Sequence, residues 1–383
     1  MSKDKKKTSL RYRLIWPLRN EKWQPISIPV ASILISFIAA AIVILLLGKN
    51  PLQAFYNLFQ GAGILPKASY AGYKSMLTDF LSLLNAMTPL VFASLAVAVA
   101  LRAGLFNIGV AGQMLVSGFL ATIIVGYSGL DAIIAKPLVL LIGMVAGGLM
   151  GGLVGWLKYK FNIHEVVTTI MLNYIAQYVI SFFIHMYYID PISRQSKYIS
   201  EAARLTLVNV EFANLKMDIP LGFFLAIIVA IFIKFLMDKT VVGFEIKAVG
   251  SNPNAAKYTG IKVGTNTVLA MVISGGLAGL AGVTYYMGYF ASIQPKVLSS
   301  MGFDSIAVAL LGNSHPIGII FSSLLVSIID QGSTYMSSQA GIRQEIASVI
   351  IGLILLFSAC GAYVKHKVSR LKDKEVDRKD SES

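Results

Sequence analysis

The sequence is short of charge and nearly free of cysteine, and both shortages limit what the chain can be. Charged residues make up 14% of its 383 residues, whereas hydrophobic residues make up 56%. Because a soluble domain carries about 25% charge, this balance is typical of an integral membrane protein. The single cysteine, Cys360, excludes an intrachain disulfide and a cysteine metal cluster.

Motifs for nucleotide and metal chemistry are also missing. The pair Gly48-Lys49 is followed by Asn50, so the sequence has no P-loop to hold ATP phosphates. The pair His164-Glu165 lacks the second histidine that a zinc-peptidase helix places four residues after the first. We therefore expect no catalytic residue, no metal site and no cofactor in this chain, and no enzymatic activity.

Long hydrophobic runs dominate what is present. A spanning helix needs about 20 apolar residues to cross a hydrocarbon core of about 30 Å. The sequence predicts an all-α integral membrane fold, a polytopic bundle of about ten transmembrane helices within one transmembrane domain at 28–361. The candidate spans are 28–47, 81–101, 106–125, 137–157, 165–186, 219–237, 265–288, 301–312, 316–331 and 342–361. The eighth is too short to cross alone and the ninth is marginal.

The net charge of +14 has an explanation that needs no nucleic acid. If the N-terminus lies inside the cell, most Lys and Arg residues fall on inner segments, as the positive-inside rule requires. The basic tail 1–27 and the charged tail 362–383 are then both cytoplasmic. We expect a multi-pass protein of a cell membrane, in contact with lipid.

Two spans carry small residues at helical spacing. Glycines at intervals of four let helix backbones approach closely, which drives association where lipid supplies no hydrophobic force. They are Gly143, Gly147, Gly151 and Gly155 in the fourth span and Gly275, Gly276, Gly279 and Gly282 in the seventh. The pattern predicts tight helix packing and says nothing about a substrate.

A sizeable polar segment between two spans, 243–264, reads as one short helix on the cytoplasmic side. Asn252 suits the N-cap, Pro253 suits the first helical position, and Gly260 suits the left-handed position after the end. A helix of six or seven residues is not stable alone in water, so we expect a partner protein to hold it. An ordinary solvated turn is the alternative.

Polar residues also recur inside the membrane segments. The fifth span has a stripe of Glu165, Thr169, Asn173, Gln177 and Ser181, one every four residues. Polar groups at membrane depth must be paired or face water, so the stripe predicts either a translocation pathway or interhelical hydrogen bonds. Weaker candidates for the same pathway are Asn85, Asn107 and Gln113.

Four charged residues fall near the predicted outer ends of spans eight to ten. They are Asp304, Asp330, Arg343 and Glu345. These residues are either solvated helix ends, an outer gate, or the surface on which a delivery protein docks.

Four segments resemble the permease subunits of bacterial ATP-binding-cassette importers, in the branch for branched-chain amino acids, simple sugars and nucleosides. They are LRAGLFNIGVAGQMLVSG (101–118), HEVVTTIMLNYIA (164–176), AVGSNPNAAKYTGI (248–261) and GFDSIAVALLGNSHPIG (302–318). The sequences of these four segments are most similar to those of the nucleoside-type members. Members commonly carry an acidic residue where this chain has Ala111. The family's role for the loop around Ala111 is therefore in doubt for this chain, unless a paired permease supplies the missing charge.

The resemblance implies that 243–262 is the coupling segment, which sits in a groove of a separate cytoplasmic ATPase subunit that binds ATP and Mg. Its coupling residues would be Gly250, Asn252, Pro253, Ala255, Ala256, Lys257 and Gly260, with Gly250 and Gly260 at the helix ends. It also implies an extracytoplasmic substrate-binding protein and a second permease, identical or homologous.

The sequence thus predicts nucleoside import driven by a partner ATPase. A simple sugar as substrate, an ion-coupled secondary transporter and a membrane scaffold are the alternatives.

Overall fold

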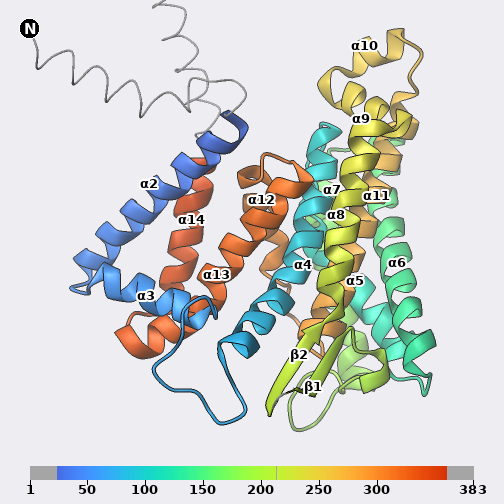
Figure 1. Ribbon diagram of the computed structural model, residues 1–383. Helices are drawn as coiled ribbons and strands as arrows, with labels where there is room; N and C mark the ends of the chain where they lie inside the picture. The colour runs from blue at the N-terminus through green and yellow to red at the C-terminus, as the bar shows by residue number, and fades with distance from the viewer. Residues whose placement is uncertain (1–23, 213, 360–383) are drawn as a thin grey trace, which may run out of the picture.

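The computed structural model describes residues 24–212 and 214–359 as a bundle of helices with one small hairpin (Figure 1). The two charged tails, apart from residues 24–27, and Cys360 lie outside these residues. Seven of the described helices are long and apolar enough to cross a membrane. They are α2 (Gln24–Leu46), α4 (Met76–Arg102), α6 (Ala132–Phe161), α7 (Glu165–Phe183), α8 (Leu221–Lys239), α11 (Val263–Thr284) and α13 (Pro316–Ala340).

Three predicted spans form shorter helices, α5 (Val110–Ala121), α12 (Met301–Leu311) and α14 (Glu345–Ala359). The polytopic helical bundle is therefore confirmed. Elements that the sequence analysis missed are α3 (Pro51–Gly61), α9 (Val241–Ser251) and the antiparallel strands β1 (Thr206–Phe212) and β2 (Leu215–Pro220). Three helices end in a π-helical turn, η1 (Thr122–Gly126), η2 (Ile184–Tyr188) and η4 (Tyr285–Tyr289).

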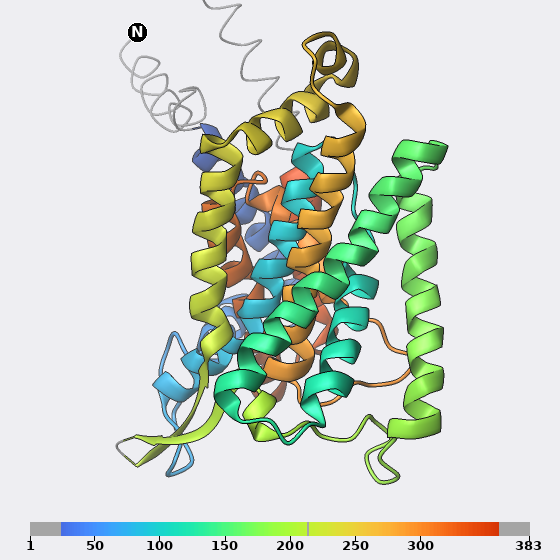
Figure 2. The ribbon, with the colours of Figure 1, turned by 90° about the vertical axis from the view of Figure 1, so that its right-hand side faces the viewer.

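The bundle has two distinct ends. Helix α9 and the short helix α10 (Pro253–Tyr258) lie at one end, and the β1–β2 hairpin lies at the other (Figures 1 and 2). We call them the α10 end and the hairpin end. Helix α4 forms the centre of the bundle, since 94% of its most hydrophobic stretch is buried within the chain, against 28% for α8.

Helices α6 and α11 touch backbone to backbone. A Cβ atom added to Gly279 would overlap the carbonyl oxygen of Gly143, and one added to Gly147 would overlap that of Gly275. The glycine spacing in the two spans therefore had the predicted consequence.

Helices α5 and α12 both begin inside the bundle rather than at its ends. Asn107, just before α5, donates a 2.9 Å hydrogen bond to Ser274 Oγ, which donates to the carbonyl of Ala96. Ala96 lies six residues before the end of α4, or about 9 Å inside the bundle at 1.5 Å per residue. The first turn of α12 meets the first turn of α5, because a Cβ on Gly302 would lie 2.6 Å from that of Ala111.

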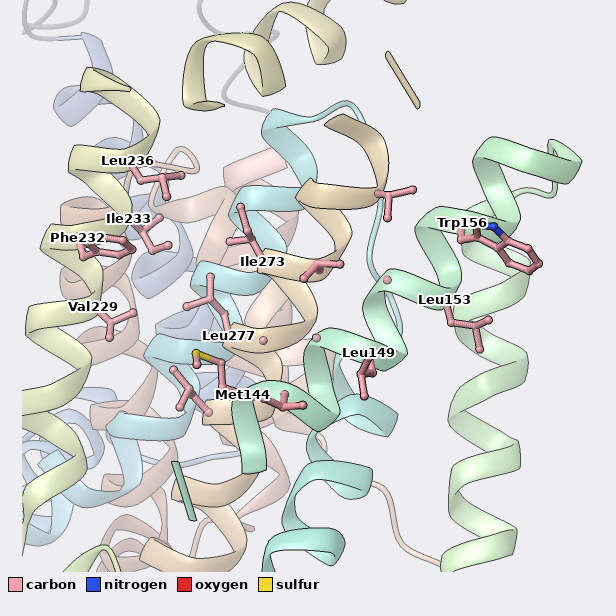
Figure 3. Close-up of a pocket in the computed structure, with 17 residues that line it drawn as sticks. Met144, Leu149, Leu153, Trp156, Val229, Phe232, Ile233, Leu236, Ile273 and Leu277 are labelled. Atoms are coloured by element: carbon pink, nitrogen blue, oxygen red, sulfur yellow. The ribbon is translucent and has the colours of Figure 1, made fainter. Parts of the chain in front are cut away.

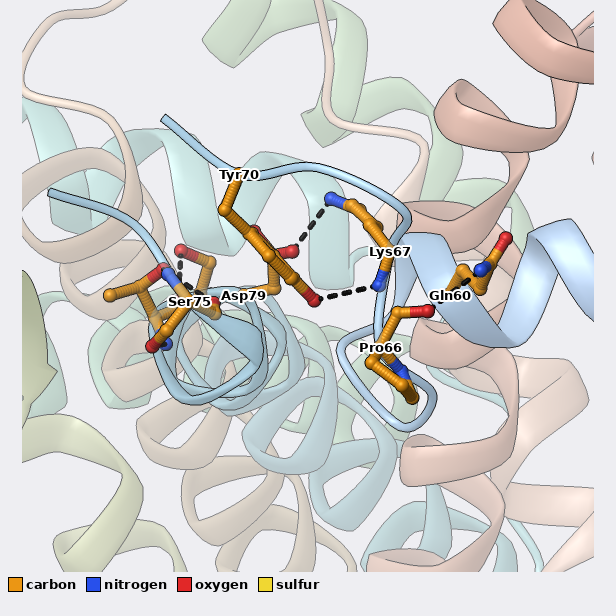
Figure 4. Close-up of polar contacts among 8 residues, drawn as sticks. Gln60, Pro66, Lys67, Tyr70, Ser75 and Asp79 are labelled. Carbon is orange, nitrogen blue, oxygen red and sulfur yellow. Dashed lines mark hydrogen bonds and ion pairs between the residues drawn. The ribbon is translucent and has the colours of Figure 1, made fainter. Parts of the chain in front are cut away.

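Helix α3 lies at the hairpin end (Figure 1), and polar contacts hold the segment after it near the start of α4 (Figure 4). Gln60 donates to the carbonyl of Pro66, and Lys67 forms a 2.6 Å ion pair with Asp79 at the start of α4. Helix α3 also packs on α13, where a Cβ on Gly332 would overlap the carbonyl oxygen of Leu58. This support explains why α13 continues to Ala340, nine residues beyond the predicted end of the ninth span.

Candidate functional site

The short helix at the α10 end has the boundaries that the sequence predicts. Asn252 Oδ1 accepts hydrogen bonds from the backbone N–H groups of Asn254 and Ala255, both at 3.0 Å. Pro253 is the first helical residue, and Gly260 has a left-handed φ of +85°. One prediction was incomplete, because Val241–Ser251 forms a second helix, α9, that ends where α10 begins.

Helix α10 projects from the bundle with most of its surface uncovered (Figure 2). Pro253, Ala255 and Lys257 are exposed, and Tyr258 is 94% exposed. Ala256 is buried within its own chain at 4% exposure. The structure therefore turns Ala256 toward its own chain and leaves Ala255 and Tyr258 on the outer surface.

Gly250 does not lie at the end of α10, contrary to its predicted position. It lies within α9, where a Cβ would be 2.7 Å from the carbonyl carbon of Ala103 and 2.8 Å from the amide nitrogen of Gly104. Gly104 itself has a left-handed φ of +70°. The glycine is needed at this position because α9 crosses directly over the chain that follows α4.

The polar stripe of α7 faces its own chain. Asn173 accepts a 2.9 Å hydrogen bond from the N–H of Gly112 and donates a 3.0 Å bond to the carbonyl of Ile108. Gln177 donates to the carbonyl of Lys296. Thr169 donates to carbonyls of its own helix, and Glu165 forms a 2.6 Å ion pair with Lys158 of α6. These partners support the hydrogen-bonding explanation of the stripe over the pathway explanation.

The other three pathway candidates are buried and paired as well. Asn107 and Gln113 bond to each other and, through Ser274, to α4 and α11. Asn85 accepts a 3.0 Å hydrogen bond from Thr206 of β1. The structure brings the first two together in one cluster and places Asn85 elsewhere, toward the hairpin end.

The outer charged residues separate into two groups. Arg343 and Glu345 are exposed after the end of α13. Asp330 lies ten residues before that end, or about 15 Å along the helix, and Asp304 lies in the first turn of α12, inside the bundle. The predicted outer position is wrong for these two aspartates, because α13 is longer than its apolar run and α12 starts at depth.

Asp304 and Asp330 both lie near the aromatic turn η4. In this turn the ring of Tyr285 lies 6.4 Å from that of Tyr289 and 4.9 Å from that of Phe290. Asp304 is half-buried, whereas Asp330 is exposed on the surface of this chain. A carboxylate exposed at membrane depth is costly against lipid, so Asp330 needs water or another polypeptide beside it.

Sequence reasoning missed the exposed face of α7, a helix that stands apart at one side of the bundle (Figure 2). Tyr174 and Tyr178 are 53% and 63% exposed in the middle of this helix. Tyrosine hydroxyls prefer a polar partner, and hydrocarbon offers none. The signal was available, because tyrosines four residues apart line one helix face.

A lateral groove of about 900 Å³ lies between α6 and α8 over α11 (Figure 3). Its walls include Leu149, Leu153, Phe232 and Leu277, and Trp156 supplies the one side chain with a polar atom. A groove of this chemistry suits hydrocarbon chains of lipid and offers nothing to orient a polar solute.

Ala111 is fully buried against Gly302, as described above. An acidic side chain at this position would have to displace the first turn of α12. The alanine therefore matches the close approach of α5 and α12 in this chain.

Comparison with known proteins places these features in a family. Residues 80–359 match the family described as branched-chain amino acid transport system / permease component. The chain is 35% identical to the nucleoside ABC transporter permease protein NupB of Lactococcus lactis, over 95% of this chain and 99% of that protein. It is 35% identical to the guanosine ABC transporter permease protein NupP of Bacillus subtilis, over 91% and 97%.

A more distant relative is the glucose ABC transporter permease protein TsgB13 of Haloferax volcanii, 27% identical over 90% of this chain and 89% of that protein. The family match covers most of the chain, and two relatives exceed 30% identity over nearly their whole length. The chain belongs to the permease family of branched-chain amino acid type ABC transport systems.

Proposed function

We propose that this permease imports nucleosides across the cell membrane, driven by a separate ATPase subunit on which α10 seats. The observation that carries the proposal is α10 itself, a six-residue helix with its own N-cap, projecting from the membrane bundle with Tyr258 almost fully exposed. An exposed aromatic side chain on a rigid helix is a typical anchor for a protein interface.

The α10 end then lies in the cytoplasm, and with it both chain termini. ATP and Mg bind to the partner ATPase, and the permease contributes no nucleotide site. ATP-driven closure of the ATPase would move α10 and bias the bundle between inward-facing and outward-facing states. It does so only to the extent that the ATPase binds the two states with different affinity.

The names of the relatives support a nucleoside as the substrate. NupB and NupP, a nucleoside and a guanosine permease, are each 35% identical to this chain, whereas the glucose permease is 27% identical. A simple sugar is the second candidate because of that last relative. An ion-coupled mechanism has less support, since it gives α10 no task.

We place the substrate path on the surface of this chain rather than through its core. The stripe residues Asn173 and Gln177 are already paired within the chain, whereas Asp330 and the tyrosines of α7 are uncovered at membrane depth. A second permease facing these groups would enclose a water-filled path. Asp304 and Asp330 would then bond to ribose hydroxyls or water as the substrate passes Tyr285.

Permeases of this family act with an ATPase and a substrate-binding protein. In this chain the binding protein would dock at the hairpin end, where Arg343 and Glu345 are exposed.

The decisive experiment is uptake of labelled nucleosides and of labelled ribose by host cells with and without this gene, before and after ATP depletion. The proposal requires loss of ATP-dependent nucleoside uptake when the gene is deleted. Loss of ribose uptake instead would move the substrate to sugars, and gene-dependent uptake that survives ATP depletion would overturn the mechanism.

A further inference from the structure

Helix α9 is attached to three membrane helices at the α10 end. Glu245 accepts a 2.8 Å hydrogen bond from Asn266 of α11, and Lys247 lies 3.7 Å from Asp238 at the end of α8. Gly250 lies against the backbone that follows α4. Movement of α10 therefore reaches the bundle through α9, with which α10 makes most of its contacts, and through α11, which follows α10 in the chain and also touches it.

Arg102, in the last turn of α4, connects this platform to a more distant element. Its Nη1 lies 3.7 Å from Asp238, and its Nε donates a 2.9 Å hydrogen bond to the carbonyl of Ser314. Ser314 lies in the turn between α12 and α13, 212 residues along the chain. The guanidinium group of Arg102 thus links the ends of α4 and α8 to the α12–α13 turn. The backbone carbonyl oxygen of Arg102 is also the atom that a Cβ on Gly250 would meet most closely.

The turn that Arg102 holds has an unfavourable backbone. Asn313 and Ser314 are both left-handed, with φ of +53° and +51°. Asn tolerates this conformation, whereas Ser does so less readily. A hydrogen bond from a charged donor to the Ser314 carbonyl stabilises the turn, since charge-assisted bonds are stronger than neutral ones. Backbone hydrogen bonds also support the turn from within, from the Ser314 N–H to the Ala309 carbonyl and from the His315 N–H to the Gly312 carbonyl. Arg102 adds a hydrogen bond from outside the turn, so a movement of Arg102 pulls on a strained backbone.

The far end of α12 carries a residue of the proposed path. The helix spans 11 residues, Met301–Leu311, or about 16 Å at 1.5 Å per residue. Asp304 lies in its first turn, where Gly302 packs on Ala111. A shift of the turn at one end of a rigid helix must shift Asp304 at the other.

We propose that Arg102 is the positioning residue that transmits movement of α9 and α10 to the α12–α13 turn and so to Asp304. The proposal rests on the coupling role given above to α10. It extends that role from the ATPase-facing helix to a defined chain of contacts inside the permease, namely Gly250, Arg102, Ser314 and α12.

The test uses the complete importer in proteoliposomes, with nucleoside uptake and ATP hydrolysis measured on the same preparation. Arg102→Leu should leave the ATPase bound and hydrolysing while uptake per ATP falls about tenfold or more, the size of a typical coupling term. Arg102→Lys retains the charge near Asp238 but not the planar donor for Ser314. Its uptake per ATP should therefore fall between those of wild type and Arg102→Leu. Lys239→Met, which removes an exposed charge at the same end, is the matched control.

Equal uptake per ATP in Arg102→Leu and wild type would overturn this inference alone. An equal loss in Lys239→Met would also overturn it, because the effect would then be one of general charge. If Arg102→Leu fails to assemble, Arg102→Lys is the test, and wild-type uptake per ATP in that variant would overturn the inference. A wild-type importer without ATP-driven nucleoside uptake would instead contradict the proposed function.

Discussion

The contact between α6 and α11 predicts opposite effects for two neighbouring glycines. In Gly279→Ala the new Cβ would overlap the carbonyl oxygen of Gly143 and lie 2.8 Å from its carbon. Ordinary carbon contacts need about 3.5 Å or more, so the two helices would have to separate by roughly 1 Å. Such overpacking costs about 1–3 kcal/mol, which outweighs the gain of about 1 kcal/mol in helix propensity.

Gly276→Ala is the matched control on the same helix. Its Cβ would meet Met144 at 3.4 Å, with no backbone atom closer. We expect this variant to be neutral or more stable by up to about 1 kcal/mol. The measurement is thermal unfolding of the purified permease in detergent, comparing midpoints of both variants with wild type. Equal losses of stability in the two variants would refute the close backbone contact.

Three further substitutions test other contacts. Asn173→Leu leaves the buried N–H of Gly112 and the part-buried carbonyl of Ile108 unpaired, so it should lower the free energy of unfolding by about 1–3 kcal/mol; an unchanged thermal midpoint would contradict the pairing. Ala111→Asp should destabilise the chain by a similar amount, because burial of a charge adds to the crowding against Gly302; a stable, active variant would show that this site has room. Asp330→Asn should leave the thermal midpoint unchanged and slow uptake by about tenfold, whereas wild-type uptake kinetics would remove Asp330 from the path.

Local signals in the sequence were sufficient for some features. Asn252, Pro253 and Gly260 define α10 through side-chain and backbone preferences that act within a few residues. The glycines at spacing four define the α6–α11 contact for a similar reason, since each span shows its own small face. Hydropathy was enough for the bundle of spans.

Features that depend on distant parts of the chain could not be predicted. The face that α7 presents inward depends on the segments around Ile108 and Lys296, which supply partners to Asn173 and Gln177. Helix α13 extends past its apolar run because α3 packs on Gly332. The depth of Asp330 follows from this extension of α13, and the depth of Asp304 follows from the packing of Gly302 on Ala111, so the sequence placed both residues too near the outer surface.

The central claim is that α10 binds a separate ATPase, and Tyr258 tests it most directly. The measurement is the affinity of the purified ATPase for the permease in nanodiscs, for Tyr258→Ala and for Tyr198→Ala, whose tyrosine is 68% exposed outside α10. An anchor residue contributes about 2 kcal/mol or more, so Tyr258→Ala should weaken binding by about 30-fold while Tyr198→Ala leaves it unchanged. Wild-type affinity in Tyr258→Ala, or equal losses in both variants, would contradict the account.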